Sequence, residues 1–295
     1  MSDRIVDRVE RAMGKRPVEV RPLSGGCVGE VYRAEMGSGE RVVVKVDGSA
    51  SARLDIEGRM LRDLGERSEL PVPRVLHSTP DLLVMEYIDE ASGEALGITD
   101  GREEHAADLL AALHTIGPLG ERAGWFGYDY DTLIGGLHQP NPWMESWTAF
   151  FAEHRLASMA REAMRAGRLG SGTVAQVERL GERLEGVLGL GAVSPSLIHG
   201  DVWGGNVIAS GRRICGFIDP AIYYAHSEVE LAFITMFHTF GKRFFDRYRE
   251  HRPIEAGFWE VRREVYTLYP LLVHVRLFGG GYVGQVEGIL RRFAG

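Results

Sequence analysis

The chain has 295 residues, of which 44% are hydrophobic and 25% are charged, and its formal net charge is −7. This balance is ordinary for a globular protein and excludes a disordered or fibrous chain. Lys and Arg form no run longer than a pair. That excludes the basic surface of a duplex-binding protein and a polybasic membrane patch, so we expect neither nucleic acid nor membrane as a partner.

Two further features of the sequence indicate the cellular compartment of the protein. The start of the chain has no apolar signal-peptide core, and the apolar stretch 269–283 is interrupted by His274 and Arg276 and is too short to span a bilayer. Cys27 and Cys215 do not make a disulfide framework. We therefore expect a cytoplasmic protein, with Cys215 in its core.

Strand-like and helical patterns divide the chain into two regions. Alternating or β-branched segments predict early strands at 28–36, 41–47 and 81–88, with one helix among them at 51–67. Further along, helices are predicted at 103–116, 144–167 and 173–190, and short strands at 196–199, 206–209 and 214–219. This order indicates a small β-rich lobe, a larger helical lobe, and a ligand cleft where the two meet.

Aromatic residues, with one methionine among them, recur at helical spacing in two places and are expected to pack in the core. The first group is Trp143, Trp147, Phe150 and Phe151, and the second is Phe233, Met236, Phe237 and Phe240. The glycine run 279–281 is expected to form a turn between the terminal helices.

The segment SGGCVGEVY, residues 24–32, lies between two predicted strands, so neither a Walker loop nor a dinucleotide-binding fold fits it. Gly26, Gly29 and Val31 match the kinase pattern G-x-G-x-x-G-x-V, with Ser24 in place of the first glycine and Gly25 beside it. Without Cβ atoms, backbone N–H groups can approach phosphate oxygens. The alternative is an ordinary β-hairpin turn.

Lys45 lies among valines in the second predicted strand, so its ammonium group should be half buried and needs an anionic partner. In the helix that follows, one face carries Leu54, Glu57, Leu61 and Leu64. A carboxylate therefore stands on an apolar stripe. Pairing of Lys45 with Glu57, both close to nucleotide phosphates, explains both anomalies. The alternative is a surface lysine whose ammonium group reaches water.

The most informative segment is LIHGDVWGGNV, residues 197–207. Asp201 and Asn206 have the spacing of the kinase catalytic loop H-R-D-x-x-x-x-N. There a carboxylate meets the acceptor hydroxyl while an amide oxygen holds a metal ion on the phosphates. Asp219, thirteen residues after Asn206, stands where a second magnesium ligand belongs. Each fragment alone could be an Asx turn or a strand-end cap, but the order of all of them indicates a kinase-like phosphotransferase.

The loop reads His199-Gly200-Asp201, with glycine where protein kinases carry an arginine that answers a phosphorylated activation loop. Only ten residues lie between Asp219 and Glu230, which leaves no room for a long activation segment. The enzyme is therefore expected to be constitutively assembled and to act on something other than a hydroxyl of an extended peptide. His199 is expected to hydrogen-bond the loop backbone.

From about residue 15 to its end, the sequence resembles the fructosamine kinase (ketosamine 3-kinase) family, in its bacterial branch. The resemblance is carried by GGCVGEVYRAE, LPVPRVLH, DLLVMEYI, DTLIGGLHQPN, SLIHGDVWGGNV, FIDPAIYYAHSEVELAF and LYPLLVHVRLFGGGYV. The catalytic loop is shared with aminoglycoside and choline kinases, whereas the DPAIYY and LIGG-x-x-QPN segments are narrower markers. Departures are minor: Gly204 stands where many relatives have serine, and His138 where proline is common.

The resemblance implies a bilobal, protein-kinase-like α+β fold. Its N-lobe, residues 1–88, would carry an antiparallel five-stranded sheet and one helix, and its C-lobe, residues 89–295, would be mainly helical. The implied activity is ATP- and Mg²⁺-dependent phosphorylation of the sugar 3-hydroxyl of ketosamines, which are glycation products on lysines or free amines. The phosphorylated adduct then decomposes and releases the amine, so the implied role is deglycation or repair.

The resemblance also implies a role for each matching residue. Asp201 would accept the proton of the sugar hydroxyl. Lys45 would hold the α- and β-phosphates and be oriented by Glu57, and Mg²⁺ would be held by Asn206 and Asp219. The phosphates would be covered by Gly25, Gly26 and Gly29, and adenine would pair with the backbone of Glu86 and Ile88 in the hinge Met85-Glu86-Tyr87-Ile88.

Two residues near these motifs suggest further hypotheses. Trp203 lies two residues after the expected base, where an aromatic face suits sugar C–H groups and a substrate ammonium; a core tryptophan under the loop is the alternative. Cys27 lies in the phosphate loop, where N–H groups favour a thiolate. A redox switch with a disulfide-linked homodimer is one interpretation of Cys27, and an inert residue in a monomer is the other.

Two other functions stay open on the residues alone. One is a small-molecule kinase with a different acceptor, such as an aminoglycoside or an amino alcohol. The other is a catalytically inactive, kinase-fold binding module, against which the complete set of motif residues argues.

Overall fold

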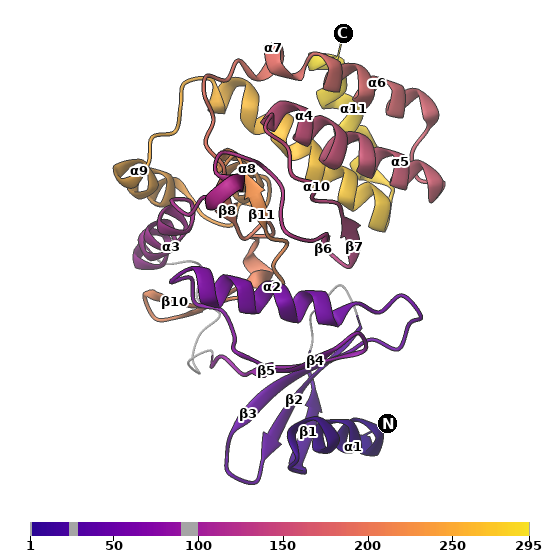
Figure 1. Ribbon diagram of the computed structural model, residues 1–295, viewed down its shortest axis with the longest axis vertical. Helices are drawn as coiled ribbons and strands as arrows, with labels where there is room; N and C mark the ends of the chain where they lie inside the picture. The colour runs from indigo at the N-terminus through magenta and orange to yellow at the C-terminus, as the bar shows by residue number, and fades with distance from the viewer. Residues whose placement is uncertain (1, 24–28, 90–99, 295) are drawn as a thin grey trace.

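The computed structural model describes residues 2–23, 29–89 and 100–294. Figure 1 shows a sheet with helices packed on it at the N-terminal end of the molecule and a larger, mainly helical part at the other end. Helix α2 (Leu54–Arg67) lies between the sheet and the larger part. The expected bilobal α+β architecture is therefore confirmed, while the boundary between residues 88 and 89 stays a prediction.

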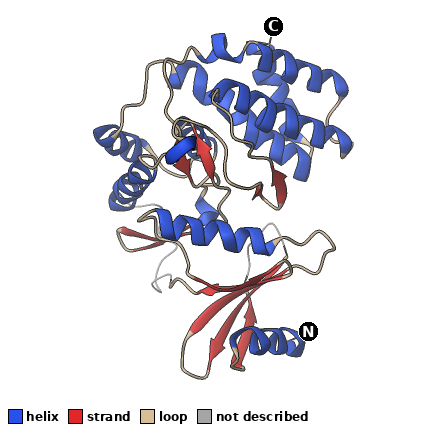
Figure 2. Ribbon diagram, in the orientation of Figure 1, coloured by secondary structure: helices blue, strands red, loops and turns tan. Residues whose placement is uncertain are grey.

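The sheet of the N-lobe is antiparallel and has five strands in the order β1-β2-β3-β5-β4. The strands are β1 (Pro17–Pro22), β2 (Glu30–Met36), β3 (Arg41–Val46), β4 (Val75–Thr79) and β5 (Leu82–Glu86). Three of them, β2, β3 and β5, are the strands predicted individually from the sequence. Figure 2 shows this sheet in red between the helices of the lobe.

The N-lobe contains two helices, α1 (Ser2–Met13) and α2 (Leu54–Arg67), where one was predicted. The reason for the additional helix lies in the sheet, because both of its faces are apolar and each needs a cover. Ile5 and Val9 of α1 are buried against one face. Leu54 and Leu61 of α2 are buried against the other.

Alternation along β3 decides which side chain meets which helix. Val42 and Val44 belong to the cluster under α1, whereas Val43 packs with the cluster under α2. Since successive side chains of a strand point to opposite faces, Lys45 points to the same side as Val43, toward α2. The strand therefore directs its one ammonium group at the helix that carries Glu57.

The C-lobe is built around one large apolar cluster. Its helices are α3 (Asp100–Leu113), η1 (Gly120–Arg122), α4 (Trp147–Phe151), η2 (Ala152–Ala157), α5 (Ser158–Arg165), α6 (Ser171–Glu182), α7 (Leu184–Leu188), η3 (Gly204–Asn206), α8 (Glu228–Met236), α9 (Lys242–His251), η4 (Phe258–Arg262), α10 (Arg263–Phe278) and α11 (Gly281–Phe293). The helix predicted at 144–167 is interrupted by the π-helical η2, and the one predicted at 173–190 is divided into α6 and α7.

Three two-stranded sheets shape the loops of the C-lobe. They pair β6 (Thr132–Ile134) with β7 (Leu137–Gln139), β8 (Ser196–Ile198) with β11 (Tyr223–Ala225), and β9 (Val207–Ser210) with β10 (Arg213–Phe217). The predicted catalytic loop connects β8 to β9, and Asp219 follows β10. The β6–β7 hairpin and β11 were not predicted as strands.

The other structural expectations have mixed outcomes. Trp147, Phe150 and Phe151 are buried as predicted, and the glycine run does separate α10 from α11. Cys215 was predicted in the core but is only half-buried, because it alternates on β10 with the buried Ile214 and Gly216. Across residues 2–23, 29–89 and 100–294, no helix is long and apolar enough to cross a membrane.

Candidate active site

A cleft of about 690 Å³ lies between the two lobes. Its walls include Val31 and Val43 of the sheet and Ile208 of β9. Charged and polar side chains from both lobes meet in it, and they are the ones that the motifs predicted: Lys45, Glu57, Asp201, Asn206 and Asp219.

Lys45 joins the lobes through two carboxylates. Its Nζ lies 2.6 Å from Oε1 of Glu57, which confirms the predicted pair, and it also contacts Oδ1 of Asp219. Lys45 is only 6% exposed. Burial alone would lower its pKa, but the charges of Glu57 and Asp219 outweigh burial and raise the pKa of Lys45. The ammonium group is therefore held charged, as phosphate binding requires.

Asp219 reaches this cluster from an unusual backbone conformation. Its φ is 54°, in the left-handed region that residues other than glycine seldom adopt. The backbone on either side is fixed, since the N–H of Ile218 donates to the carbonyl of Asn206 at 3.0 Å and the N–H of Ala221 donates to the carbonyl of His199 at 2.7 Å. The segment after β10 is thus held against the catalytic loop at both ends.

Steric constraints explain why a glycine stands in the His-Gly-Asp sequence. Gly200 has a φ of 86°, and a Cβ atom there would lie 2.2 Å from the carbonyl oxygen of Ala221. The arginine of protein kinases cannot occupy this position without moving the loop. From the sequence, we interpreted this glycine only as the loss of a contact to an activation loop. The structure shows that the conformation of the backbone itself requires a glycine at this position.

Asp201 and Asn206 are in direct contact. Nδ2 of Asn206 donates to Oδ2 of Asp201 at 2.9 Å and to its main-chain carbonyl at 3.0 Å. Burial, with the nearby charge of Asp219, raises the pKa of Asp201 to about 7, although the bond from Asn206 acts to lower it. A carboxylate with a pKa near neutrality is well matched to accepting a proton from a hydroxyl group.

The loop that carries Asp201 is anchored from beneath by Glu230. Oε1 of this buried residue accepts the N–H of Gly200 at 2.6 Å, and Oε2 lies 2.8 Å from Nε2 of His114. Nδ1 of His114 is 2.7 Å from the hydroxyl of Tyr248. Burial would raise the pKa of Glu230, but the bonds from His114 and Gly200 outweigh it and lower the pKa. Glu230 therefore supports the loop as a carboxylate.

His199 makes a hydrogen bond with the backbone of the loop, as the sequence predicted. It is fully buried, and its Nδ1 accepts the N–H of Asp201 at 3.3 Å. Burial lowers the pKa of His199, so the ring is neutral.

The donor set at the end of the cleft fits a magnesium ion. Asn206 uses its amide nitrogen on Asp201, which leaves the amide oxygen available, and Asp219 offers a carboxylate. Among the described residues there is no cluster of three or more His, Cys, Asp or Glu side chains that could hold a metal. Mg²⁺ is usually held by one or two protein oxygens together with substrate phosphates.

The predicted hinge lines the cleft with all four of its residues: Met85, Glu86, Tyr87 and Ile88. The N–H groups of Glu86 and Tyr87 are used by the carbonyls of Arg74 and Arg41, at 2.9 and 3.3 Å. Within the described ranges, the N–H of Ile88 has no such backbone partner.

The glycine loop can be described only in part. Gly25, Gly26 and Cys27 lie outside the described residues. Gly29 has a φ of 73°, and a Cβ atom there would lie 2.4 Å from the carbonyl oxygen of Val46, so the start of β2 requires glycine.

Trp203 is not a core residue. Its side chain is 39% exposed, and it lines the cleft beside Gly204 and Gly205. The indole ring lies over Gly205, where a Cβ atom would come within 2.3 Å of it. The main-chain N–H of Trp203 donates to the carbonyl of Asp201 at 3.1 Å, so the two residues belong to one turn of the loop.

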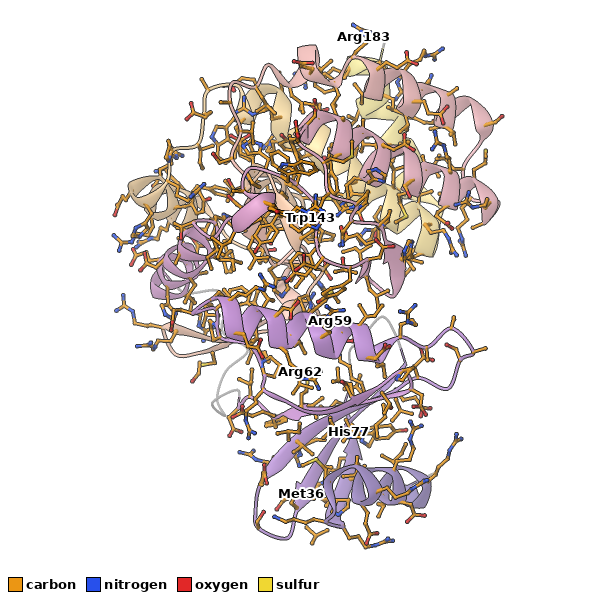
Figure 3. The ribbon with its side chains drawn as sticks, in the orientation of Figure 1. Met36, Arg59, Arg62, His77, Trp143 and Arg183 are labelled. Atoms are coloured by element: carbon orange, nitrogen blue, oxygen red, sulfur yellow. The ribbon has the colours of Figure 1, made fainter. Side chains whose placement is uncertain are left out.

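Helix α2 is held against the C-lobe by two tyrosines that precede β6. The hydroxyls of Tyr128 and Tyr130 donate to Oδ2 of Asp63 at 2.9 and 2.8 Å. The guanidinium carbon of Arg59 lies 3.6 Å from the ring centre of Tyr130. Figure 3 marks Arg59 on α2, between the sheet and the C-lobe. The helix that supplies Glu57 is thus fixed without a phosphorylated segment.

Several of these residues were not predicted to serve the site. Glu230 and His114 each lie in an apolar helical stretch, which is a signal for a buried polar group that needs a partner. The β6–β7 hairpin has a Gly-Gly turn, Gly135-Gly136, that lines the cleft. No local pattern marks Asp63, since its tyrosine partners are 65 and 67 residues away.

Comparison with known proteins identifies relatives of this chain. The profile of the family described as fructosamine kinase matches residues 1–294. Ketosamine-3-kinase of Mus musculus is 33% identical, over 97% of this chain and 98% of its own.

Solved structures show the same relationship. A crystal structure of a protein assigned as a fructosamine-3-kinase, from Thermobifida fusca, has a TM-score of 0.82 and 31% identity, over 97% of this chain and 98% of its own. An ADP-bound aminoglycoside phosphotransferase has a TM-score of 0.67 at 18% identity, over 100% of this chain and 98% of its own, and shares the fold alone.

Proposed function

The chain belongs to the fructosamine kinase family, and we propose that it transfers the γ-phosphoryl group of ATP to the sugar 3-hydroxyl of ketosamines. The observation that carries this proposal is the cleft in which the Lys45–Glu57–Asp219 cluster and the Asp201–Asn206 pair face one another. The relative from Mus musculus is named for the same reaction.

Each of these side chains has a role in the transfer of the phosphoryl group. The sugar oxygen attacks the γ-phosphorus, the bond from that phosphorus to the oxygen bridging it to the β-phosphate breaks, and the hydroxyl proton passes to Asp201. Lys45 balances the charge of the α- and β-phosphates, and Glu57 keeps its ammonium group in place. The N–H of Ile88 and the carbonyl of Glu86 receive the adenine. Such a site gains its rate from positioning and electrostatics, without a covalent intermediate on the protein.

Asn206 and Asp219 would hold Mg²⁺. The ion would neutralise charge that develops on the phosphate oxygens during transfer. The contact between Lys45 and Asp219 supports this proposal, because it would bring the ammonium group and the metal ion to neighbouring positions on one triphosphate. We also propose that residues 1–88 and 89–295 are the two lobes that close on the nucleotide.

Acceptor profiling tests the proposal. ADP release is measured with Mg-ATP and fructosyl-lysine, ribulosyl-lysine, an aminoglycoside, choline or no acceptor. We expect turnover confined to the two ketosamines. Turnover of the aminoglycoside or choline alone would keep the kinase mechanism and contradict the acceptor, and ATP binding without any turnover would indicate a binding module instead.

A further inference from the structure

A buried amide links the β6–β7 hairpin to the segment that follows Asp219. Gln139, the last residue of β7, is 1% exposed. Its Nε2 donates to Oγ1 of Thr132 at 2.8 Å and to the carbonyl of Ala221 at 3.1 Å. Its Oε1 accepts the hydroxyl of Tyr269, in α10, at 2.7 Å. Both amide hydrogens are used and the Ala221 carbonyl can only accept, so the side chain is held in one orientation.

Ala221 is the point at which this segment touches the catalytic loop. A Cβ atom on Gly200, the residue before the proposed base, would lie 2.2 Å from the Ala221 oxygen, so this oxygen packs directly on the Gly200 backbone. The N–H of Ala221 donates to the carbonyl of His199 at 2.7 Å. Ala221 is also the second residue after Asp219. A displacement of Ala221 would therefore move Asp219 and Asp201 relative to each other.

The amide of Gln139 is supported by a network of buried polar side chains. Oγ1 of Thr132 accepts a second bond, from Nδ2 of Asn141 at 2.8 Å. Oδ1 of Asn141 accepts Nη2 of Arg155 at 2.5 Å, and the guanidinium carbon of Arg155 lies 3.8 Å from the ring centre of Tyr223. Each of these residues is at most 2% exposed. Since buried hydrogen-bond networks make their surroundings rigid, Gln139 is a firm support for the Ala221 carbonyl.

The hairpin that carries Gln139 also forms part of the wall of the cleft. Thr132 and Gln139 are cross-strand partners in it, and the Gly135-Gly136 turn at its other end lines the cleft. Burial of an amide has a cost that its hydrogen bonds only offset, so packing alone does not explain a glutamine here. The bond to Ala221, across 82 residues of sequence, joins the cleft wall to the catalytic loop.

We propose that Gln139 is a positioning residue of the active site: its amide holds the Ala221 carbonyl against the catalytic loop and so sets the position of Asp201 relative to Asp219. The effect on turnover rests on the proposed function, whereas the positioning is a property of the folded chain. Loss of the amide is expected to lower kcat much more than it changes the KM for ATP, because alignment of the reacting groups matters in the transition state and ATP is bound mainly by other residues.

Two tyrosines of α10 provide matched variants. Tyr269 and Tyr266 are three residues apart and are 5% and 0% exposed. Tyr269→Phe removes the hydroxyl that is bonded to Gln139. Tyr266→Phe is the control, because it removes a hydroxyl that lies 3.0 Å from Nε1 of Trp147 and 2.8 Å from Nδ1 of His226. Gln139→Met, which keeps the length of the side chain without its polar atoms, removes the whole contact.

Amide hydrogen exchange of the substrate-free chain measures the positioning directly. The probe is the N–H of Ala221, compared within each protein with buried helical amides that report global unfolding. In Gln139→Met we expect this N–H to exchange about 2- to 12-fold faster, the shift in local opening that one lost hydrogen bond causes. Tyr269→Phe should show a smaller increase, and Tyr266→Phe should show none.

Steady-state kinetics with fructosyl-lysine and Mg-ATP measure the consequence. We expect kcat to fall about tenfold or more in Gln139→Met and less in Tyr269→Phe, with the KM for ATP changed little in both. Tyr266→Phe should keep the kcat of wild type. If Gln139→Met does not fold, the two tyrosine variants make the same comparison.

The outcomes separate this inference from the proposed function. Faster exchange at Ala221 together with the lower kcat, in the Gln139 and Tyr269 variants alone, would establish Gln139 as a positioning residue. Unchanged exchange at Ala221, or faster exchange with an unchanged kcat, would overturn the inference and leave the kinase activity intact. No turnover of ketosamines by wild type would overturn the proposed function, and the exchange measurement would still decide whether Gln139 holds Ala221.

Discussion

The carboxylate of Glu230 accepts the N–H of Gly200 at 2.6 Å, one residue before the proposed base. Both of its oxygens are occupied, since His114 takes the other. The catalytic loop therefore depends on a buried charge in the first turn of α8, and the position of Asp201 depends on the loop.

Glu230→Gln should lower kcat and leave the KM for ATP nearly unchanged. The amide replaces one acceptor oxygen with a donor, which leaves Gly200 or His114 without a partner and costs about 1–3 kcal/mol of folding free energy. We expect kcat to fall about tenfold or more because Asp201 is less well positioned. Steady-state kinetics and a denaturant titration measure both effects. A variant with unchanged kcat would show that this anchor does not position the base.

Gly200→Ala tests the steric requirement of the loop. Its Cβ atom would lie 2.2 Å from the Ala221 carbonyl at a φ of 86°. We expect a loss of at least about 1–3 kcal/mol of stability and a clear loss of activity. Gly204→Ala is the matched control, because a Cβ atom there meets nothing within 4 Å. Equal melting temperatures for the two variants would contradict the steric account.

The two tyrosines on Asp63 should contribute to nucleotide binding from a distance. Tyr128→Phe and Tyr130→Phe each remove one hydrogen bond to the carboxylate and, in combination, remove both bonds to its Oδ2. Each bond to the charged group is worth about 1.5–3 kcal/mol. We expect a higher KM for ATP in the double variant, because α2 and Glu57 are less firmly held. Asp63→Asn provides the comparison in a double-mutant cycle, and additive losses would argue against a shared anchor.

Asp201 should make the metal-free protein less stable as the pH rises. Its pKa is about 7 in the folded chain, against an ordinary value of 3.8. Between these values the folded chain binds more protons than the unfolded chain, so stability falls with rising pH. Asp201→Asn removes this dependence. Its stability advantage over wild type should grow by about 1.4 kcal/mol per pH unit from pH 4 to 7 and then stay constant.

Urea titrations of both proteins, in chelator and at several pH values, measure that advantage. The difference isolates Asp201 from other titrating groups, such as His226, whose pKa burial lowers to about 3. A difference that does not change with pH would mean that Asp201 titrates normally.

The parts of the site that follow short-range rules could be predicted. The alternation of β3 and the periodicity of α2 place Lys45 and Glu57 on facing surfaces, and the fixed spacing of Asp201 and Asn206 follows from one loop. The additional helix α1 was missed although its residues have a helical pattern, because the need for a cover appears only when both faces of the sheet are known.

Other parts depend on contacts that no local pattern contains. The bond from Gly200 to Glu230 spans 30 residues, and the pair of Glu230 with His114 spans 116. The same holds for Phe237, whose helical spacing is that of a core residue, although the structure leaves it half-exposed beside Trp203. Periodicity shows that a residue lies on an apolar face, and only the tertiary structure shows whether that face is covered.

The most direct test of the account is single-turnover phosphoryl transfer by Asp201→Asn, with fructosyl-lysine and Mg-ATP at saturation and nucleotide affinity measured in parallel. We predict a rate about 10² to 10⁴ lower than that of wild type, the usual contribution of a general base, with ATP bound as tightly as before. A rate within tenfold of wild type would contradict the assignment of Asp201 as the group that receives the hydroxyl proton.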